Sequence, residues 1–146
     1  MAKTNFTATV TAKEGLTMDC RAREFQFNLD EPDFLGGNNT GMNPVEALLS
    51  ALGACKAIVA RSFAEAKGFK FTDLKIELEG TLDPDGFMGL NPEAKIGFSE
   101  IHTRYFFKTD ESDERIKEFV DFMGHTFPVM DTICNAPKFS EEIVRL

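Results

Sequence analysis

The chain has 146 residues, of which 42% are apolar and 27% are charged. This length and composition fit one globular domain over residues 1–146 and exclude a disordered chain. Lys and Arg number 16 against 24 Asp and Glu, so the net charge is -8. We therefore expect neither a nucleic acid nor an anionic membrane surface as a partner, because both bind basic faces.

The sequence shows no sign of a membrane span or a secretion signal. No apolar run approaches the roughly 20 residues that cross a bilayer, and the first residues, MAKTNF, lack the apolar core of a signal peptide. The spacing of the three Cys residues fits neither a disulfide framework nor a zinc site. We expect a cytoplasmic protein with free thiols and no bound metal.

The first third of the chain alternates apolar and polar residues with a period of two, which is typical of half-buried strands. We predict strands over 5–12, 16–20 and 22–29, arranged as a small antiparallel meander. Residues 30–42 are rich in Gly, Asn and Pro, and this composition predicts a loop.

A long helix follows this loop. Asn43 is a favourable N-cap, Pro44 suits the first helical position and Glu46 lies three residues after the cap. We expect the helix to run to about Lys67 and to stop at Gly68. Its long uncharged stretch predicts burial on more than one side, with close approach of another segment at the small residues Ala51, Gly53 and Ala54.

The second half returns to strands and then to shorter helices. We predict strands over 71–81 and 96–108 joined by a loop over 83–95, a helix from Asp110 or Ser112 to Gly124 or His125, a short helix over 128–134 and a closing strand over 138–145. The element order is β-β-β-α-β-β-α-α-β. It predicts an α+β fold with antiparallel sheets around a long buried central helix.

Cys55 lies on the apolar stripe of the long helix, at helical spacing from Leu52 and Val59. It has two interpretations: a small core side chain or a nucleophilic thiol. The helix dipole fades within the first turn, so it does not activate a thiol three turns along. Lys56 is adjacent but points roughly 100° away. A nucleophile would therefore need an Arg or Lys from another element.

The run from Asp30 to Ile58, DEPDFLGGNNTGMNPVEALLSALGACKAI, resembles the signature of the OsmC/Ohr family of thiol-dependent hydroperoxide reductases. In that family a Gly-rich loop leads into Asn-Pro and a long buried helix. The peroxidatic Cys lies two to three turns along this helix, which here is Cys55. The family's late Cys-Pro-Val motif is matched in part by FPV at 127–129. The resemblance covers nearly the whole chain.

The resemblance implies an intertwined homodimer with two active sites at its interface, acting on organic hydroperoxides in the oxidative stress response. It implies no cofactor. In the family, the first Cys attacks the peroxide and becomes a sulfenic acid, which a second Cys converts to a disulfide. An Arg and a Glu position the thiolate.

This sequence departs from the family pattern in three places. Phe127 replaces the second Cys, and Cys134 lies seven residues later, about 10 Å along a helix. The acidic residue that follows Asn-Pro is shifted by one position to Glu46, which is either catalytic or a residue favoured near a helix N-terminus. The family's Arg has no firm counterpart. Arg23, on a predicted strand, is our candidate, and its partner is either the Cys55 thiolate or Glu46.

Other candidates are weaker. Cys20 belongs to the first strands, and nothing in the sequence places it near the long helix. Neither His102 nor His125 has a second ligand at metal spacing, so we expect no metal site. The Gly36-Gly37 loop lacks the context of a phosphate-binding loop.

These observations favour a thiol-dependent peroxidase that reduces organic hydroperoxides. Its candidate catalytic residues are Cys55, Arg23 and Glu46. Because Phe127 replaces the second Cys, an external thiol would resolve the oxidised protein. The alternative is a non-peroxidatic protein of the same fold that binds a small apolar ligand at the dimer cleft.

Overall fold

The computed structural model describes residues 2–146, which form two compact units. The first unit ends at Ser50 and the second begins at Ala51, so the boundary lies inside the long helix α1 (Pro44–Ala64). The prediction of one domain over the whole chain stays a prediction. The antiparallel sheets and the long helix of the predicted α+β class are present.

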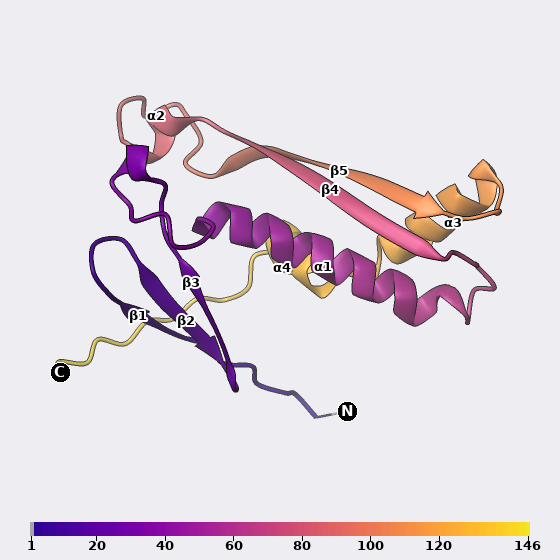
Figure 1. The fold of residues 1–146 in the computed structure, drawn as a ribbon, viewed down its shortest axis with the longest axis horizontal. Coiled ribbons are helices and arrows are strands. Elements are labelled where there is room, and N and C mark those ends of the chain that lie inside the picture. Colours follow the sequence, from indigo (N-terminus) through magenta and orange to yellow (C-terminus); the bar gives the residue numbers. More distant parts are fainter. Residues whose placement is uncertain (1) are drawn as a thin grey trace. The chain divides into compact units, whose positions relative to one another are not determined.

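The first unit contains a three-stranded antiparallel sheet of β1 (Thr9–Ala12), β2 (Met18–Ala22) and β3 (Phe25–Leu29), in that spatial order (Figure 1). This sheet confirms the predicted meander. The third strand begins later than predicted, because Arg23 has a φ of 53° and lies in the turn between β2 and β3. A side chain in this turn does not belong to the alternating face of a regular strand.

One buried carboxylate organises the loop that leads to α1. Asp30 is 2% exposed and accepts hydrogen bonds of 2.6 Å from the hydroxyls of both Thr17 and Thr40. It also accepts backbone N–H bonds from Glu31, Asn38 and Thr40. The hydroxyl and N–H donors hold the pKa of Asp30 well below its usual value. The charged side chain therefore fixes the loop, which includes the short helix η1 (Asp33–Leu35).

The start of α1 is a reciprocal capping arrangement. The Asn43 side chain accepts from the Glu46 backbone N–H, and the Glu46 carboxylate accepts from the Asn43 backbone N–H, each at 2.9 Å. This confirms the predicted helix start. After α1 the chain turns at Gly68, whose φ of 62° is the left-handed conformation that favours glycine.

The buried residues of α1 form one stripe, and this differs from the predicted burial on more than one side. They are Leu52, Gly53, Lys56, Val59 and Ala60. Val45, Leu48 and Ile58 are exposed in the single chain. The sequence pattern marks apolar residues, but it does not show which of them the same chain covers.

α1 has the length and composition of a membrane-spanning helix. We expected no apolar run of this length from the sequence. The core helix of a soluble protein meets the same criteria, so this property does not distinguish the two settings.

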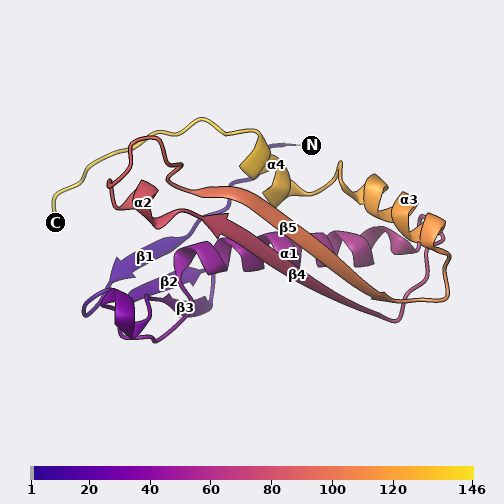
Figure 2. The ribbon, with the colours of Figure 1, turned by 90° about the horizontal axis from the view of Figure 1, so that it is seen from above.

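The second unit packs a long hairpin along α1. Strands β4 (Asp73–Leu82) and β5 (Phe98–Lys108) pair antiparallel, with the short helix α2 (Pro84–Phe87) in the connection between them. Figures 1 and 2 show both strands running beside α1. Gly53 permits this approach, because a Cβ there would lie 2.6 Å from the Leu78 side chain. The predicted close approach at Gly53 is thus confirmed.

Two helices complete the second unit. Ser112 caps α3 (Asp113–Met123), and Phe127 precedes α4 (Pro128–Cys134), as the sequence predicts. A stacked aromatic pair, Phe69 and Phe119, lies in the core with a centroid distance of 4.3 Å. The core cluster consists of Val59, Ala60, Phe69, Phe119, Met123 and Phe127.

The predicted closing strand over 138–145 is wrong. These residues have no strand assignment, and their apolar side chains Phe139, Ile143 and Val144 are exposed. This segment has the alternation typical of a strand, but it pairs with no other strand among residues 2–146 of the single chain.

Candidate functional site

The most unusual side chain in the second unit is Lys56, which is 6% exposed. Its ammonium donates a hydrogen bond of 3.2 Å to the Tyr105 hydroxyl. It also lies 5.5 Å from the centroid of the Tyr105 ring and 5.0 Å from that of the Phe127 ring. Among the residues that the structure describes, no carboxylate forms an ion pair with Lys56.

The pKa of Lys56 reflects opposing effects. Burial lowers this pKa, because the charged form loses its hydration. The negative charges of the Cys55 and Cys134 thiolates oppose this decrease. Burial also raises the pKa of Tyr105, so this hydroxyl is a neutral hydrogen-bond partner at neutral pH. Cys55 and Cys134 are therefore the two side chains whose negative charge, when present, raises the pKa of this lysine.

Cys55 is half-buried and packs against the core cluster that contains Phe127. The sequence predicts that a cation activating Cys55 comes from another element, and this stays a prediction. The ammonium of the neighbouring Lys56 is held by its contacts with Tyr105 and Phe127.

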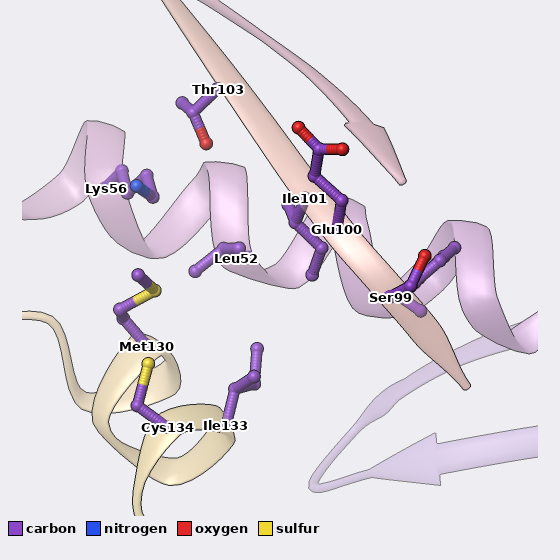
Figure 3. Close-up of a pocket in the computed structure, with 10 residues that line it drawn as sticks. Leu52, Lys56, Ser99, Glu100, Ile101, Thr103, Met130, Ile133 and Cys134 are labelled. Atoms are coloured by element: carbon purple, nitrogen blue, oxygen red, sulfur yellow. The ribbon is translucent and has the colours of Figure 1, made fainter. Parts of the chain in front are cut away.

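A pocket of about 230 Å³ lies beside Lys56, between α1, β5 and α4 (Figure 3). Much of its wall is apolar, and Cys134 at the end of α4 contributes a thiol. Figure 3 shows the Cys134 sulfur next to Met130, on the side of α4 that faces α1. The other lining residues are Leu52, Phe98, Ser99, Glu100, Ile101, Thr103 and Ile133. The pocket thus combines a buried cation, a thiol and an apolar wall.

The three thiols differ in environment. Cys20 is buried in β2, with its sulfur 3.9 Å from the Met18 carbonyl oxygen, and it belongs to the first unit. Cys55 is half-buried and Cys134 is exposed, and both belong to the second unit. All three are free. Only the two thiols of the second unit are near Lys56 in the part of the chain that the structure describes.

Phe127 stands where the family motif has its second Cys. Its side chain is buried in the core cluster, and its ring lies against the Lys56 ammonium. Phe127 therefore presents an aromatic surface, which attracts a cation, to the Lys56 ammonium.

Arg23 and Glu46 both belong to the first unit, whereas Cys55 belongs to the second. Arg23 is exposed in its turn, 3.9 Å from Glu24 and above the Phe25 ring. Glu46 is engaged in the helix cap. It precedes Cys55 by nine residues, which is about 13 Å along a helix axis. The catalytic roles predicted for Arg23 and Glu46 stay predictions.

Sequence reasoning missed Lys56 and Tyr105 as members of the site. A signal for Lys56 was present: it follows Leu52 by four residues and precedes Val59 by three, so it shares their helix face. No sequence signal pairs Tyr105 with it, because only the hairpin packing against α1 brings β5 to this lysine.

The described residues contain no group of three or more His, Cys, Asp or Glu side chains placed to hold a metal ion. His102 lies on β5 opposite Glu79 on β4, and His125 follows the end of α3. Neither histidine lies among the residues that line the pocket.

The fold and this site define a class: an α+β protein with a thiol on a long helix, beside a buried cation. Residues 36–142 match a family model described as OsmC-like protein. A hydroperoxide reductase from Mycoplasma pneumoniae is 30% identical, over 86% of this chain and 84% of its own. A hydroperoxide reductase from Mycoplasma genitalium is 27% identical, over 88% and 78%.

The solved structures agree with these relatives. The crystal structure of an OsmC-like protein from Mycoplasma pneumoniae matches with a TM-score of 0.79 and 26% identity, covering 92% of this chain and 91% of that one. The chain belongs to the OsmC-like protein family. This confirms the resemblance and the fold class inferred from the sequence.

Proposed function

We propose that this protein is a thiol-dependent peroxidase that reduces organic hydroperoxides in the cytoplasm, with Cys55 as its nucleophile. Two observations support this proposal. The Mycoplasma relatives are hydroperoxide reductases by name. In this chain, Cys55 neighbours a buried ammonium that lacks a carboxylate partner among the described residues, and a cation favours the reactive thiolate.

The proposed cycle uses one protein thiol. The Cys55 thiolate attacks one peroxide oxygen, the O–O bond breaks, and the alkoxide takes a proton and leaves as an alcohol. Cys55 becomes a sulfenic acid. An external thiol condenses with it, forming a mixed disulfide and water, and a second external thiol then releases reduced Cys55 and a disulfide. Phe127 in place of the motif Cys is the reason for an external resolver.

The proposal includes a homodimer. In the single chain, α1 leaves apolar side chains uncovered, among them Ile58 at 65% exposure, and uncovered apolar side chains on a core helix suit an interface. Arg23 and Glu46 retain their proposed positioning roles on the thiolate. We assign these roles to the copies donated by the partner chain, because Glu46 is far along the same helix from Cys55.

The decisive experiment follows the oxidation of Cys55. Reduced protein is mixed with cumene hydroperoxide and, separately, with hydrogen peroxide, and mass spectrometry locates the modified Cys over time. We expect fast oxidation of Cys55 by the organic peroxide and none in the Cys55→Ser variant. A Cys55 that is no more reactive than free cysteine would rule out the peroxidase proposal.

A second candidate function is the binding of a small apolar ligand at the dimer cleft, with Cys55 as a packing residue. The pocket beside Leu52 and Met130 favours this function, because its wall is largely apolar. It predicts that Cys55→Ser retains ligand binding. An apolar ligand should then raise the melting temperatures of the wild type and of Cys55→Ser equally. Thermal shift with cumyl alcohol as a probe tests this prediction.

A further inference from the structure

The Lys56 ammonium is a buried charge with few partners. A buried charge is costly unless it is paired, because it loses its hydration. In this structure one hydroxyl and two aromatic faces hold the ammonium, and one of its three N–H donors has a partner among the described residues. A buried cation with so few partners favours a negative charge close to it.

The titratable groups around Lys56 come from three elements. On α1 the neighbour is Cys55, and on α4 it is Cys134. On β5, Tyr105 is the hydroxyl partner, and Glu100 lines the same pocket but forms no ion pair with Lys56. Cys55 and Cys134 are therefore the nucleophilic side chains among these neighbours.

Cys134 differs from an isolated surface cysteine. It lines the same pocket as Lys56, and its sulfur lies on the side of α4 that faces α1 (Figure 3). It is also exposed, so a reagent reaches it without unfolding the protein. Lys56 thus has a half-buried thiol on its own helix and an accessible thiol across the pocket.

We propose that Lys56 is a further positioning residue of this site, and that its buried ammonium makes both Cys55 and Cys134 react as nucleophiles. Cys134 would then be a second reactive thiol, open to small electrophiles and oxidants that fit the pocket. The part concerning Cys55 deepens the proposed function and rests on it, whereas the part concerning Cys134 does not.

Alkylation measures this reactivity without peroxide. In the reaction with iodoacetamide, the thiolate sulfur forms a bond to carbon and iodide leaves, so the rate follows the thiolate fraction. Mass spectrometry of the same sample reports Cys55, Cys134 and the buried Cys20 separately. Cys20 lies in the first unit and serves as an internal control for opening of the fold.

The test compares Lys56→Met with Lys75→Met. Lys75 is a matched control because it also lies above an aromatic ring, Phe106 at 4.5 Å, but it is exposed and pairs with Glu77. We expect Lys56→Met to slow the alkylation of both Cys55 and Cys134 at pH 7 by roughly tenfold, because a nearby cation favours the reactive thiolate. Lys75→Met and Lys56→Arg should leave both rates within about twofold of the wild type.

The pH profile separates an electrostatic role from a structural one. Above about pH 10, free thiols are ionised without help, so we expect the rates of Lys56→Met and the wild type to converge. Unchanged rates at pH 7, slowing of only one thiol, or equal slowing at pH 7 and pH 10 would each overturn the proposal.

A second variant, Tyr105→Phe, tests the proposal even if Lys56→Met does not fold. Tyr105→Phe keeps the ring but removes the hydroxyl that holds the ammonium. We expect it to slow both thiols by about two- to threefold at pH 7, a fraction of the full effect of the charge. If Lys56→Met does not fold, Tyr105→Phe becomes the deciding variant. Alkylation rates in Tyr105→Phe equal to those of the wild type would then overturn the proposal.

The test also distinguishes this inference from the proposed function. If Lys56 governs alkylation but peroxide leaves Cys55 reduced, the inference holds and the peroxidase function fails. If peroxide oxidises Cys55 while the alkylation rates are unchanged in Lys56→Met, the function holds and the inference fails.

Discussion

A buried carboxylate of the first unit, Asp30, and a buried ammonium of the second unit, Lys56, differ in how their charges are satisfied. In the first unit, Asp30 accepts five hydrogen bonds from hydroxyl and backbone donors. In the second unit, Lys56 has one hydroxyl partner and two aromatic faces. Asp30 is satisfied by its own loop, whereas Lys56 retains capacity for an anion.

The contrast shows how a buried charge indicates its role. A fully hydrogen-bonded carboxylate stabilises one conformation, because each donor would lose its partner if the loop opened. A buried ammonium without an anionic partner among the described residues costs free energy in the resting protein. We therefore assign a structural role to Asp30 and a chemical role to Lys56.

The largest effect is expected when the aromatic support of Lys56 is removed. Phe127→Ala should lower the free energy of unfolding by about 3–5 kcal/mol, because it leaves a cavity in the core cluster. Urea denaturation measures this change. Phe139→Ala is the matched control, since Phe139 is 84% exposed, and it should have no measurable effect. A small loss in Phe127→Ala would show that this ring is not a core element.

Asp30→Asn tests the satisfied charge. An amide cannot accept all the donors that meet the carboxylate, so we expect a fall in melting temperature of about 5 °C or more. Asp33→Asn, an exposed change in η1, is the control. An unchanged melting temperature in Asp30→Asn would contradict the structural role of this charge.

The same carboxylate predicts a pH dependence. The hydrogen-bond donors around Asp30 lower its folded pKa below the ordinary value of 3.8. The stability it contributes is therefore fully present above the unfolded pKa and is lost as the pH falls through the folded pKa. The difference in melting temperature between wild type and Asp30→Asn should accordingly narrow below about pH 4. A difference that widens in acid would contradict this sign.

Glu46 provides a third, exposed charge, whose contacts are those of a helix cap. Glu46→Ala should cost about 1 kcal/mol of stability, through loss of the reciprocal hydrogen bonds with Asn43. Glu46→Gln retains an acceptor and should cost less. If Glu46→Gln nevertheless abolishes oxidation of Cys55 by peroxide, the carboxylate has the catalytic role that the sequence predicts. The same assay on Arg23→Ala tests the predicted arginine.

Local patterns in the sequence predict local structure well. The meander, the capped start of α1 and the short helix at Pro128 follow from alternation, from the spacing of Asn43 and Glu46, and from proline placement. Cys55 was singled out by its place on α1 and by the family motif. Each of these signals lies within a short stretch of chain.

The partners of Lys56 were not predictable in this way. Tyr105 is 49 residues away in sequence, and its hydroxyl reaches Lys56 only because β5 packs beside α1. The segment over 138–145 fails for a related reason: alternation predicts a strand, but a strand also needs a partner edge. Contacts between distant segments decide both cases.

A substitution of Lys56 completes the comparison of the two charges. Lys56→Met replaces a buried ammonium by an apolar side chain of similar length, so the protein should be as stable as the wild type or up to about 2 kcal/mol more stable at pH 7. Because burial holds the folded pKa of Lys56 below its ordinary value of 10.5, the unfolded chain binds more protons than the folded protein between these two pKa values. Wild-type stability should therefore rise with pH relative to Lys56→Met as Lys56 deprotonates. Urea denaturation at pH 7 and at pH 10 measures both effects.

A loss of more than about 1 kcal/mol in Lys56→Met at pH 7 would show that the ammonium stabilises the resting fold, as Asp30 does. A gain in stability together with slower thiol alkylation would show that the fold retains this charge for its chemistry.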